Sequence, residues 1–99
     1  MTSKADLARY RKLVDYGCVC CNELGIYTPP DMHHVLSGGR RMGNKFTIPL
    51  CPYHHRGVKA YWVDAKDGPS LADGSKPFEK RWGTQAQLLE RVNKAIEAK

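Results

Sequence analysis

The residues of this 99-residue chain whose types and spacing could do chemistry are a cysteine cluster, a cysteine–histidine cluster and a histidine pair. The clusters are Cys18-Val19-Cys20-Cys21 and Cys51-Pro52-Tyr53-His54-His55, and the pair His33-His34 lies between them. Zinc prefers thiolate and imidazole ligands in a tetrahedral arrangement, and C-x-x-C followed by C-x-x-H supplies four of them. Three imidazoles are then left over, which indicates a role beyond a structural metal site.

The predicted ligands of a structural zinc ion are Cys18, Cys21, Cys51 and His54. Each pair of ligands is three residues apart on a tight turn, so both side chains of a pair can reach one ion. The alternative, buried thiols that bind no metal, is disfavoured by the paired spacing. Cys20 is poorly spaced for this ion and is expected to be a small apolar packing residue.

The composition of the chain limits its expected partners and its location in the cell. The formal net charge of +6 and pI of about 9.3 favour a polyanionic partner such as nucleic acid, although basic proteins without one are common. Residues 1–15 are charged and lack a signal-peptide pattern, and no apolar stretch is long enough to span a membrane. We therefore expect one domain over residues 1–99, in the cytoplasm, where paired cysteines hold metal more often than disulfides.

The residue pattern predicts an α+β fold. Residues 32–36 and 45–50 are typical of strands, and a flexible, basic connection over residues 37–44 is expected between them. Pro52 suits the first turn of a helix and Gly57 suits its end. The cysteine and histidine clusters are thus placed on a strand, loop, strand, helix unit.

Helices are expected on both sides of this unit. Residues 3–16 form an amphipathic pattern in which Ser3 is the expected cap and Arg9 is expected to face solvent. Its predicted apolar stripe consists of Leu7, Tyr10, Leu13 and Val14. Residues 63–74 look irregular, a short helix is predicted over 77–82, and the capping-box pattern Thr84-Gln85-Ala86-Gln87 opens a last helix. The C-terminal helices together cover about residues 77–98.

Three histidines remain for catalysis, because a zinc ion closed by four protein ligands has no open position. His55 follows a zinc ligand directly on a helix, so its ring can point away from the zinc. His33 and His34 are neighbours on a strand and point to opposite faces unless the strand end bends. The alternative is that all three are ordinary surface or structural residues, which their grouping around the clamped unit disfavours.

The combined pattern resembles the HNH, or ββα-metal, endonucleases, and it is most similar to the Ref family of phage recombination-enhancement nucleases, which depend on RecA. The resemblance rests on Cys18-x-x-Cys21, His33-His34, Asn44 and Cys51-x-x-His54-His55, and on the stretches 31–43, 47–57 and 78–84. It implies a small zinc-stapled ββα-metal core over about residues 31–60 with flanking helices. The implied activity is metal-dependent hydrolysis of DNA phosphodiester bonds in a phage-encoded or bacterial protein.

The resemblance also implies residue roles. His34 occupies the position of the general base, and Asn44 that of the asparagine that braces the loop and orients the base. His33 and His55 take the positions that hold a catalytic divalent ion, Mg²⁺ or Mn²⁺, in addition to the structural Zn²⁺. Many HNH nucleases have an aspartate where this chain has His33, and an imidazole pair is softer, so it also tolerates manganese or nickel.

Four basic residues are expected to contact DNA phosphates: Arg40, Arg41, Arg56 and Lys59. Glycines on both sides of the first two allow a close approach of backbone to DNA. The alternative is a solvated loop. DNA and, by resemblance, a RecA filament are the expected partners; the oligomeric state stays open, with a monomer favoured. The competing functions are a non-catalytic zinc-knuckle nucleic-acid binder and a zinc-stabilised adaptor that binds protein only.

Overall fold

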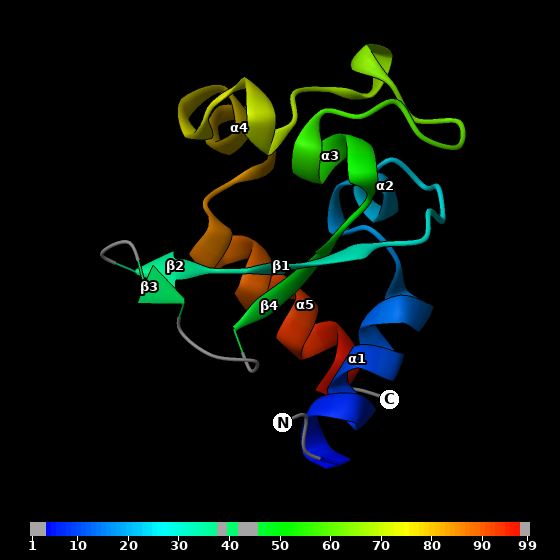
Figure 1. Ribbon diagram of the computed structural model, residues 1–99, viewed down its shortest axis with the longest axis vertical. Helices are drawn as coiled ribbons and strands as arrows, with labels where there is room; N and C mark the ends of the chain where they lie inside the picture. Colours follow the sequence, from blue (N-terminus) through cyan, green and yellow to red (C-terminus); the bar gives the residue numbers. More distant parts are fainter. Residues whose placement is uncertain (1–3, 38–39, 42–45, 98–99) are drawn as a thin grey trace.

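The computed structural model describes residues 4–37, 40–41 and 46–97, and these form an α+β fold (Figure 1). The helices are α1 (Lys4–Tyr16), α2 (Val19–Glu23), α3 (Pro52–Arg56), α4 (Ser75–Trp82) and α5 (Gln85–Glu97). The strands are β1 (Asp31–His34), β2 (Leu36–Ser37), β3 (Arg40–Arg41) and β4 (Thr47–Leu50). Two short 3-10 turns, η1 (Ala65–Asp67) and η2 (Leu71–Asp73), connect α3 with α4.

An antiparallel pair of strands, β1 and β4, lies at the centre of the fold. Its register places His33 opposite Ile48 and His34 opposite Thr47. All four residues of β4 are buried, whereas those of β1 are half-buried. The strand that carries the histidine pair is therefore the one that solvent can reach.

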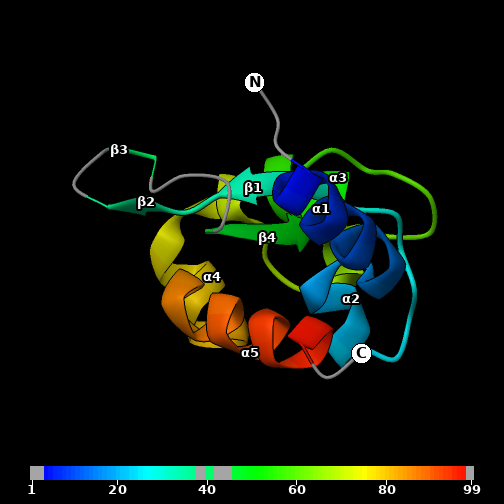
Figure 2. The same ribbon diagram turned by 90° about the horizontal axis from the view of Figure 1, so that it is seen from below.

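The predicted strand over residues 32–36 is interrupted. Val35 separates β1 from β2, and β2 pairs with β3 in a second antiparallel hairpin that extends from the body of the molecule (Figures 1 and 2). The expectation of a flexible connection over residues 37–44 is wrong for Arg40–Arg41, which form β3. The dipeptide Gly38-Gly39 between two short segments is a sequence signal for a hairpin, and this signal could have predicted the pairing.

Helices α1, α2 and α5 pack against β4, and Figure 2 shows α5 beneath the β1–β4 pair. The buried apolar side chains of α5 are Leu88, Val92 and Ile96, and Leu89 is partly buried against the same core. The predicted stripe of α1 is wrong in part, because Leu13 is fully buried but Leu7 and Val14 are 48% and 44% exposed. The predicted cap Ser3 lies outside the described residues.

Arg9 on α1 points inward, although the sequence pattern placed it toward solvent. Its guanidinium donates hydrogen bonds to the Thr47 side chain (3.1 Å), to the Thr47 carbonyl oxygen (2.7 Å) and to Asn93 Oδ1 (2.8 Å). Three oxygens compensate part of the cost of removing this charge from water, and burial lowers the pKa of Arg9. Arg9 therefore joins α1, β4 and α5 at one point.

The two helices on either side of Gly83 begin near the predicted positions. The capping box is confirmed: the Thr84 N–H donates to Gln87 Oε1 (2.8 Å) and the Gln87 N–H donates to Thr84 Oγ1 (3.1 Å). This cap fixes Gln85 as the first residue of α5. Helix α4 begins at Ser75, earlier than predicted, because proline is tolerated in the first turn of a helix.

Helix α3 is short, and both of its ends follow from the sequence. Cys51 is the N-cap, Pro52 comes first in the helix, and Gly57 ends it with a left-handed φ of 74°. His54 and His55 are consecutive residues inside this single turn and a half, so their side chains leave it in different directions. None of the helices described here is long and apolar enough to cross a membrane.

Candidate metal centres

The structure brings together four side chains that we call the Cys3His cluster: Cys18, Cys21, Cys51 and His54. All four are buried, and their ligand atoms lie within 4.8 Å of one another. His54 Nδ1 is 3.6 Å from Cys18 Sγ, 3.6 Å from Cys21 Sγ and 3.2 Å from Cys51 Sγ. These are the four residues that the spacing of the sequence selects as zinc ligands.

The dimensions of the cluster fit a tetrahedral zinc site. Zinc–sulfur bonds of about 2.3 Å and zinc–nitrogen bonds of about 2.0 Å in a tetrahedron imply S···N separations of about 3.5 Å and S···S separations of about 3.8 Å. The observed S···N distances of 3.2 to 3.6 Å and the Cys21–Cys51 sulfur separation of 3.9 Å agree with these values. The Cys3His cluster is therefore compatible with structural zinc.

Both ligand pairs are built by the same local structure. Cys18 caps α2 and Cys51 caps α3, and in each case the second ligand of the pair lies three residues later. The Cys21 N–H donates to Cys18 Sγ (3.5 Å) and the His54 N–H donates to Cys51 Sγ (3.4 Å). Two short helix starts thus aim four ligands at one point.

The His54 ring is oriented from its other side. A carbonyl oxygen can only accept a hydrogen bond, so His54 Nε2–H donates to the Asp67 carbonyl oxygen at 3.1 Å, while Nδ1 faces the sulfurs. A hydrogen bond of this kind fixes the tautomer of a metal-binding histidine. The edge of the Trp82 ring system also packs on His54, with ring centroids 5.2 Å apart.

The side chains of the Cys3His cluster shift one another's pKa values. Burial raises the pKa of Cys18, hydrogen bonds with Cys18 and Cys51 raise that of Cys21, and hydrogen bonds with Cys18 and Cys21 lower that of Cys51. Burial lowers the pKa of His54, but hydrogen bonds with Cys21 and Cys51 outweigh it and raise the pKa to about 10. These groups compete for protons in a position that a divalent cation fits.

Cys20 is fully buried but is not a member of the Cys3His cluster. It lies on α2 between the two ligand-bearing positions and belongs to the hydrophobic core. This placement agrees with the expectation of a small packing residue.

A second group, which we call the histidine centre, lies where β1 meets α3 and α5. The rings of His33 and His55 meet edge to face, with centroids 5.1 Å apart and planes at 65°. His33 Nε2–H donates to Gln85 Oε1 at 3.0 Å, which leaves the lone pair of the neutral ring on Nδ1. Asp31 is the third member of the histidine centre. It lies on the same face of β1 as His33, and its carboxylate lies beside His55.

One nitrogen of the histidine centre has no hydrogen bond within the described part of the chain. His55 Nδ1 is buried and lies 3.5 Å from Asp31 Oδ2, which is close enough for an ion pair but does not meet hydrogen-bond geometry. Buried polar atoms of this kind are rare unless an unseen group satisfies them. Imidazole nitrogen with nearby carboxylate oxygen is a donor set that divalent cations accept.

The histidine centre is not a closed ligand set. In the described ranges, the Cys3His cluster is the one group that brings three or more possible ligand atoms within 4.8 Å. Burial lowers the pKa of His33, the Gln85 hydrogen bond opposes this, and the nearby His55 and His34 lower it further. His33 is therefore neutral at pH 7, which is the form of imidazole that binds metal.

His34 is the last residue of β1 and lies opposite Thr47, the residue that Arg9 holds. Its influence on the pKa of His33 places the two imidazoles within electrostatic reach. Cross-strand partners share a face of the sheet, so His34 lies on the face of Thr47 and not on that of His33. The strand is interrupted immediately afterwards, at Val35, which is the strand end whose bending would bring the two histidines toward one site.

The predicted DNA contacts are partly outside the described residues, and so is Asn44. Of Arg40 and Arg41 the structure describes only the backbone, in β3. Arg56 ends α3 and forms an ion pair with Asp31 (3.1 Å), and Lys59 lies exposed on the loop that follows. Arg56 therefore borders the histidine centre.

Sequence reasoning missed three residues at these sites: Asp31, Gln85 and Arg9. Asp31 stands two residues before His33, a spacing that puts both side chains on one face of a strand, and this could have identified it. Gln85 was visible only as part of a capping box. Arg9 is far from both clusters in the sequence, and no local pattern marks it.

Comparison with known proteins identifies a family that covers most of the chain. The profile of a family described as "Recombination enhancement, RecA-dependent nuclease" matches residues 4–97. No curated protein matches. The matched range includes every residue of the Cys3His cluster and of the histidine centre.

Proposed function

This chain belongs to the family of recombination-enhancement, RecA-dependent nucleases, and from that membership we propose that it is an HNH-type, metal-dependent DNA endonuclease. The family implies a nuclease whose action involves DNA and RecA. The observation that carries the finer proposal is that the rings of His33 and His55 meet and that His55 Nδ1 is buried without a hydrogen bond. We take residues 1–99 as one nuclease domain, directed to its DNA by a RecA filament.

His33 and His55 are the proposed holders of a catalytic Mg²⁺ or Mn²⁺ ion. Such an ion, when bound, contacts the scissile phosphate and stabilises the charge that develops on the leaving oxygen. The orientation of His33 by Gln85 and the position of Asp31 beside His55 support this assignment. Two imidazoles and a nearby carboxylate leave room for phosphate oxygens and water, as a phosphate-binding cation requires.

His34 is the proposed general base. A neutral imidazole takes a proton from water at physiological pH, and the water oxygen then forms a bond to phosphorus as the phosphorus–oxygen bond of the leaving nucleotide breaks. The interruption of the strand at Val35, directly after His34, supports this role, because a bend there is what brings His34 toward the side of His33. Asn44 is proposed to brace the loop before β4 and to orient His34.

The Cys3His cluster has a structural role in this proposal. It fastens α2 and the start of α3 together, and α3 presents His55 to β1. Zinc bound by four protein ligands supplies folding free energy and no open position for substrate.

Basic side chains beside the histidine centre are proposed to hold the DNA backbone. Arg56 lies at the edge of the centre through its ion pair with Asp31, and Lys59 follows on the next loop. Arg40 and Arg41 on the projecting β2–β3 hairpin are proposed to contact phosphates farther along the strand. Such contacts fix position without reading sequence.

A nicking assay tests the proposed function. Zinc-loaded protein is mixed with supercoiled plasmid, with and without a RecA filament formed on a complementary oligonucleotide, in Mg²⁺, in Mn²⁺ or without added divalent ion. EDTA is avoided because it also removes structural zinc. We expect cleavage that needs the divalent ion and is stimulated by the filament.

The variant His34→Ala is expected to lower the rate about 10²- to 10⁴-fold, as loss of a general base does. Its zinc content and thermal unfolding should equal those of the parent protein. Cleavage at the parental rate by His34→Ala would contradict the assigned base. Absence of cleavage by the parent under every condition would favour a DNA-binding protein without catalysis.

A further inference from the structure

A loop that leaves the end of α3 exposes three large apolar side chains to solvent. Val58, Tyr61 and Trp62 are 50%, 59% and 54% exposed, and we call residues 58–62 the aromatic loop. Neither the metal sites nor the proposed reaction uses these side chains. A protein that leaves two neighbouring aromatic rings in water has a reason to do so other than packing.

Hydrogen bonds close and anchor the backbone of the aromatic loop. Ala60 and Val63 exchange backbone hydrogen bonds of 3.4 and 3.0 Å across the turn, and Val63 is buried. Lys66 Nζ donates to the Trp62 carbonyl oxygen at 3.1 Å. Tyr61 adopts a left-handed backbone with a φ of 55°, which is strained for a bulky residue.

The two exposed rings are neighbours. The Tyr61 and Trp62 ring centroids are 5.7 Å apart, and the ring planes are tilted by 56°. Tyrosine and tryptophan side chains have only two χ angles each, so the rings lose little conformational entropy when a partner binds. Each exposed ring suits a flat ligand such as a nucleobase.

The charges around the two rings balance, and the charge of the whole chain favours an anionic partner. Lys59 on the loop is exposed and forms no ion pair within the described part of the chain. Lys66 forms ion pairs with Asp64 and Asp67, each at 3.5 Å, so that with Lys59 these four side chains carry no net charge. The net charge of +6 on the whole chain attracts a polyanion, and Lys59 is the side chain of the loop that can contact it.

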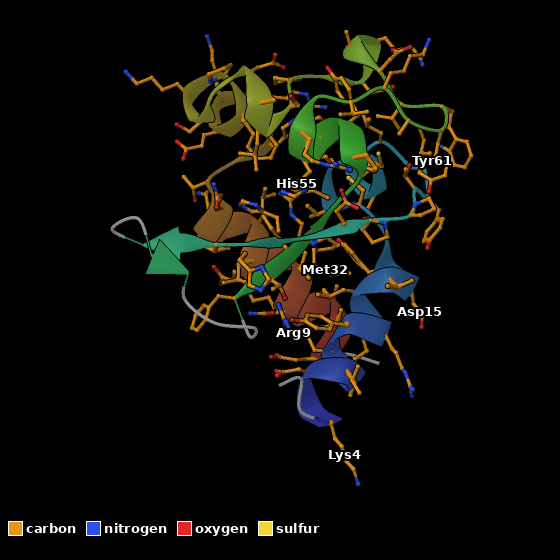
Figure 3. All side chains as sticks on the ribbon, in the orientation of Figure 1. Lys4, Arg9, Asp15, Met32, His55 and Tyr61 are labelled. Atoms are coloured by element: carbon orange, nitrogen blue, oxygen red, sulfur yellow. The ribbon has the colours of Figure 1, made fainter. Side chains whose placement is uncertain are left out.

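The loop is joined directly to the catalytic helix. Gly57 ends α3 two residues after His55, and the loop begins at the next position. Figure 3 shows Tyr61 at the outer edge of the molecule and His55 nearer its middle. The aromatic loop and the helix that carries His55 are therefore adjoining segments of the chain.

We propose that the aromatic loop binds single-stranded DNA by stacking unpaired bases on Tyr61 and Trp62 while Lys59 contacts the backbone. The identity of the partner as DNA rests on the proposed function. Bases in a duplex are already stacked on one another, and only unpaired bases present a free face. The loop thus directs the nuclease to single-stranded stretches beside the bond that it cuts.

Binding is measured by fluorescence anisotropy of a labelled oligothymidine, and of a duplex of the same length, with zinc-loaded protein and no other divalent ion. We expect preference for the single strand. Tyr61→Ala and Trp62→Ala should each weaken single-strand binding about tenfold and leave duplex binding unchanged. Trp62→Phe should keep most of the affinity, and Leu7→Ser, which removes an exposed apolar side chain of α1, should keep all of it.

Four results would overturn the proposal. The first two are equal binding of single strand and duplex by the parent, and parental affinity in the double variant Tyr61→Ala/Trp62→Ala. A third is a loss of binding by the double variant that is seen only when RecA is present, which would make the loop a protein contact. The fourth is a change of oligomeric state in the double variant, which would make the loop a self-association surface. His34→Ala should bind the oligonucleotide normally, so failure of the nuclease proposal and failure of this one are distinguishable.

Discussion

Adjacent histidines on α3 belong to two sites that differ in how completely their ligands are satisfied. His54 lies in the Cys3His cluster, where four buried ligand atoms already meet and a carbonyl oxygen fixes the ring from behind. His55 lies in the histidine centre, where Nδ1 has no hydrogen bond and the set of ligands is incomplete within the described residues. One turn of helix thus joins a closed site to an open one.

In the proposed function, this difference separates stability from catalysis. A closed set of four ligands stabilises the fold but has no position for substrate, whereas an open set depends on its surroundings for geometry and leaves room for a phosphate. The Cys3His cluster positions α3, and α3 positions His55 against His33. A substitution at the Cys3His cluster or at the histidine centre therefore tests how far the other site depends on it.

The largest expected effect comes from breaking the closed site. Cys51→Ala removes a ligand and should leave the chain without zinc and unfolded. The metal contributes on the order of 10 kcal/mol in small zinc domains, which is comparable to the whole stability of a domain. Mass spectrometry measures the zinc content, and thermal melting followed by circular dichroism measures the folded state.

Cys20→Ala is the matched control, and it should keep both zinc and a cooperative unfolding transition. A folded Cys51→Ala protein would show that the Cys3His cluster is dispensable for folding.

A smaller effect is expected at Arg9, which binds Thr47 at the start of β4, the end of the strand away from Cys51. Arg9→Ala removes three hydrogen bonds from a charged donor and should lower the free energy of unfolding by about 2 kcal/mol. Urea denaturation measures the change, and Arg11→Ala on the exposed face of α1 should change it little. Equal stabilities of the two variants would mean that Arg9 is solvated, as its sequence pattern suggested.

The smallest effect is expected at Gln85, which acts on the open site only. Gln85→Ala frees the ring of His33 and should lower the cleavage rate about tenfold, as loss of a partner behind a metal-binding histidine does. Zinc content should not change. Gln87→Ala breaks the capping box of α5 instead and should cost about 1 kcal/mol of stability with cleavage retained. A reversed outcome would assign the structural role to Gln85.

Much of the closed site could be predicted from the sequence because its ligands are close together in the chain. Two pairs at a spacing of three residues identify Cys18, Cys21, Cys51 and His54 without knowledge of the fold. The capping box at Thr84 and the end of α3 at Gly57 are equally local, and both are observed.

The open site was predicted less completely because its geometry depends on distant parts of the chain. Gln85 reaches His33 across 52 positions and Arg9 reaches Thr47 across 38, and no local pattern encodes such contacts. The exposure of Leu7 and Val14 has the same origin, since the partner helix α5 decides which side of α1 is covered. Tertiary packing overrides the helical stripe there.

The neighbouring histidines offer the most direct test of the account. Zinc content, thermal unfolding and RecA-dependent nicking are measured on His54→Ala and His55→Ala in parallel. We expect His54→Ala to lose zinc and its folded state, and His55→Ala to retain one zinc ion per chain and the parental melting temperature while cleavage falls at least about a hundredfold. Loss of zinc from both variants, or parental cleavage by His55→Ala, would contradict the division into a closed and an open site.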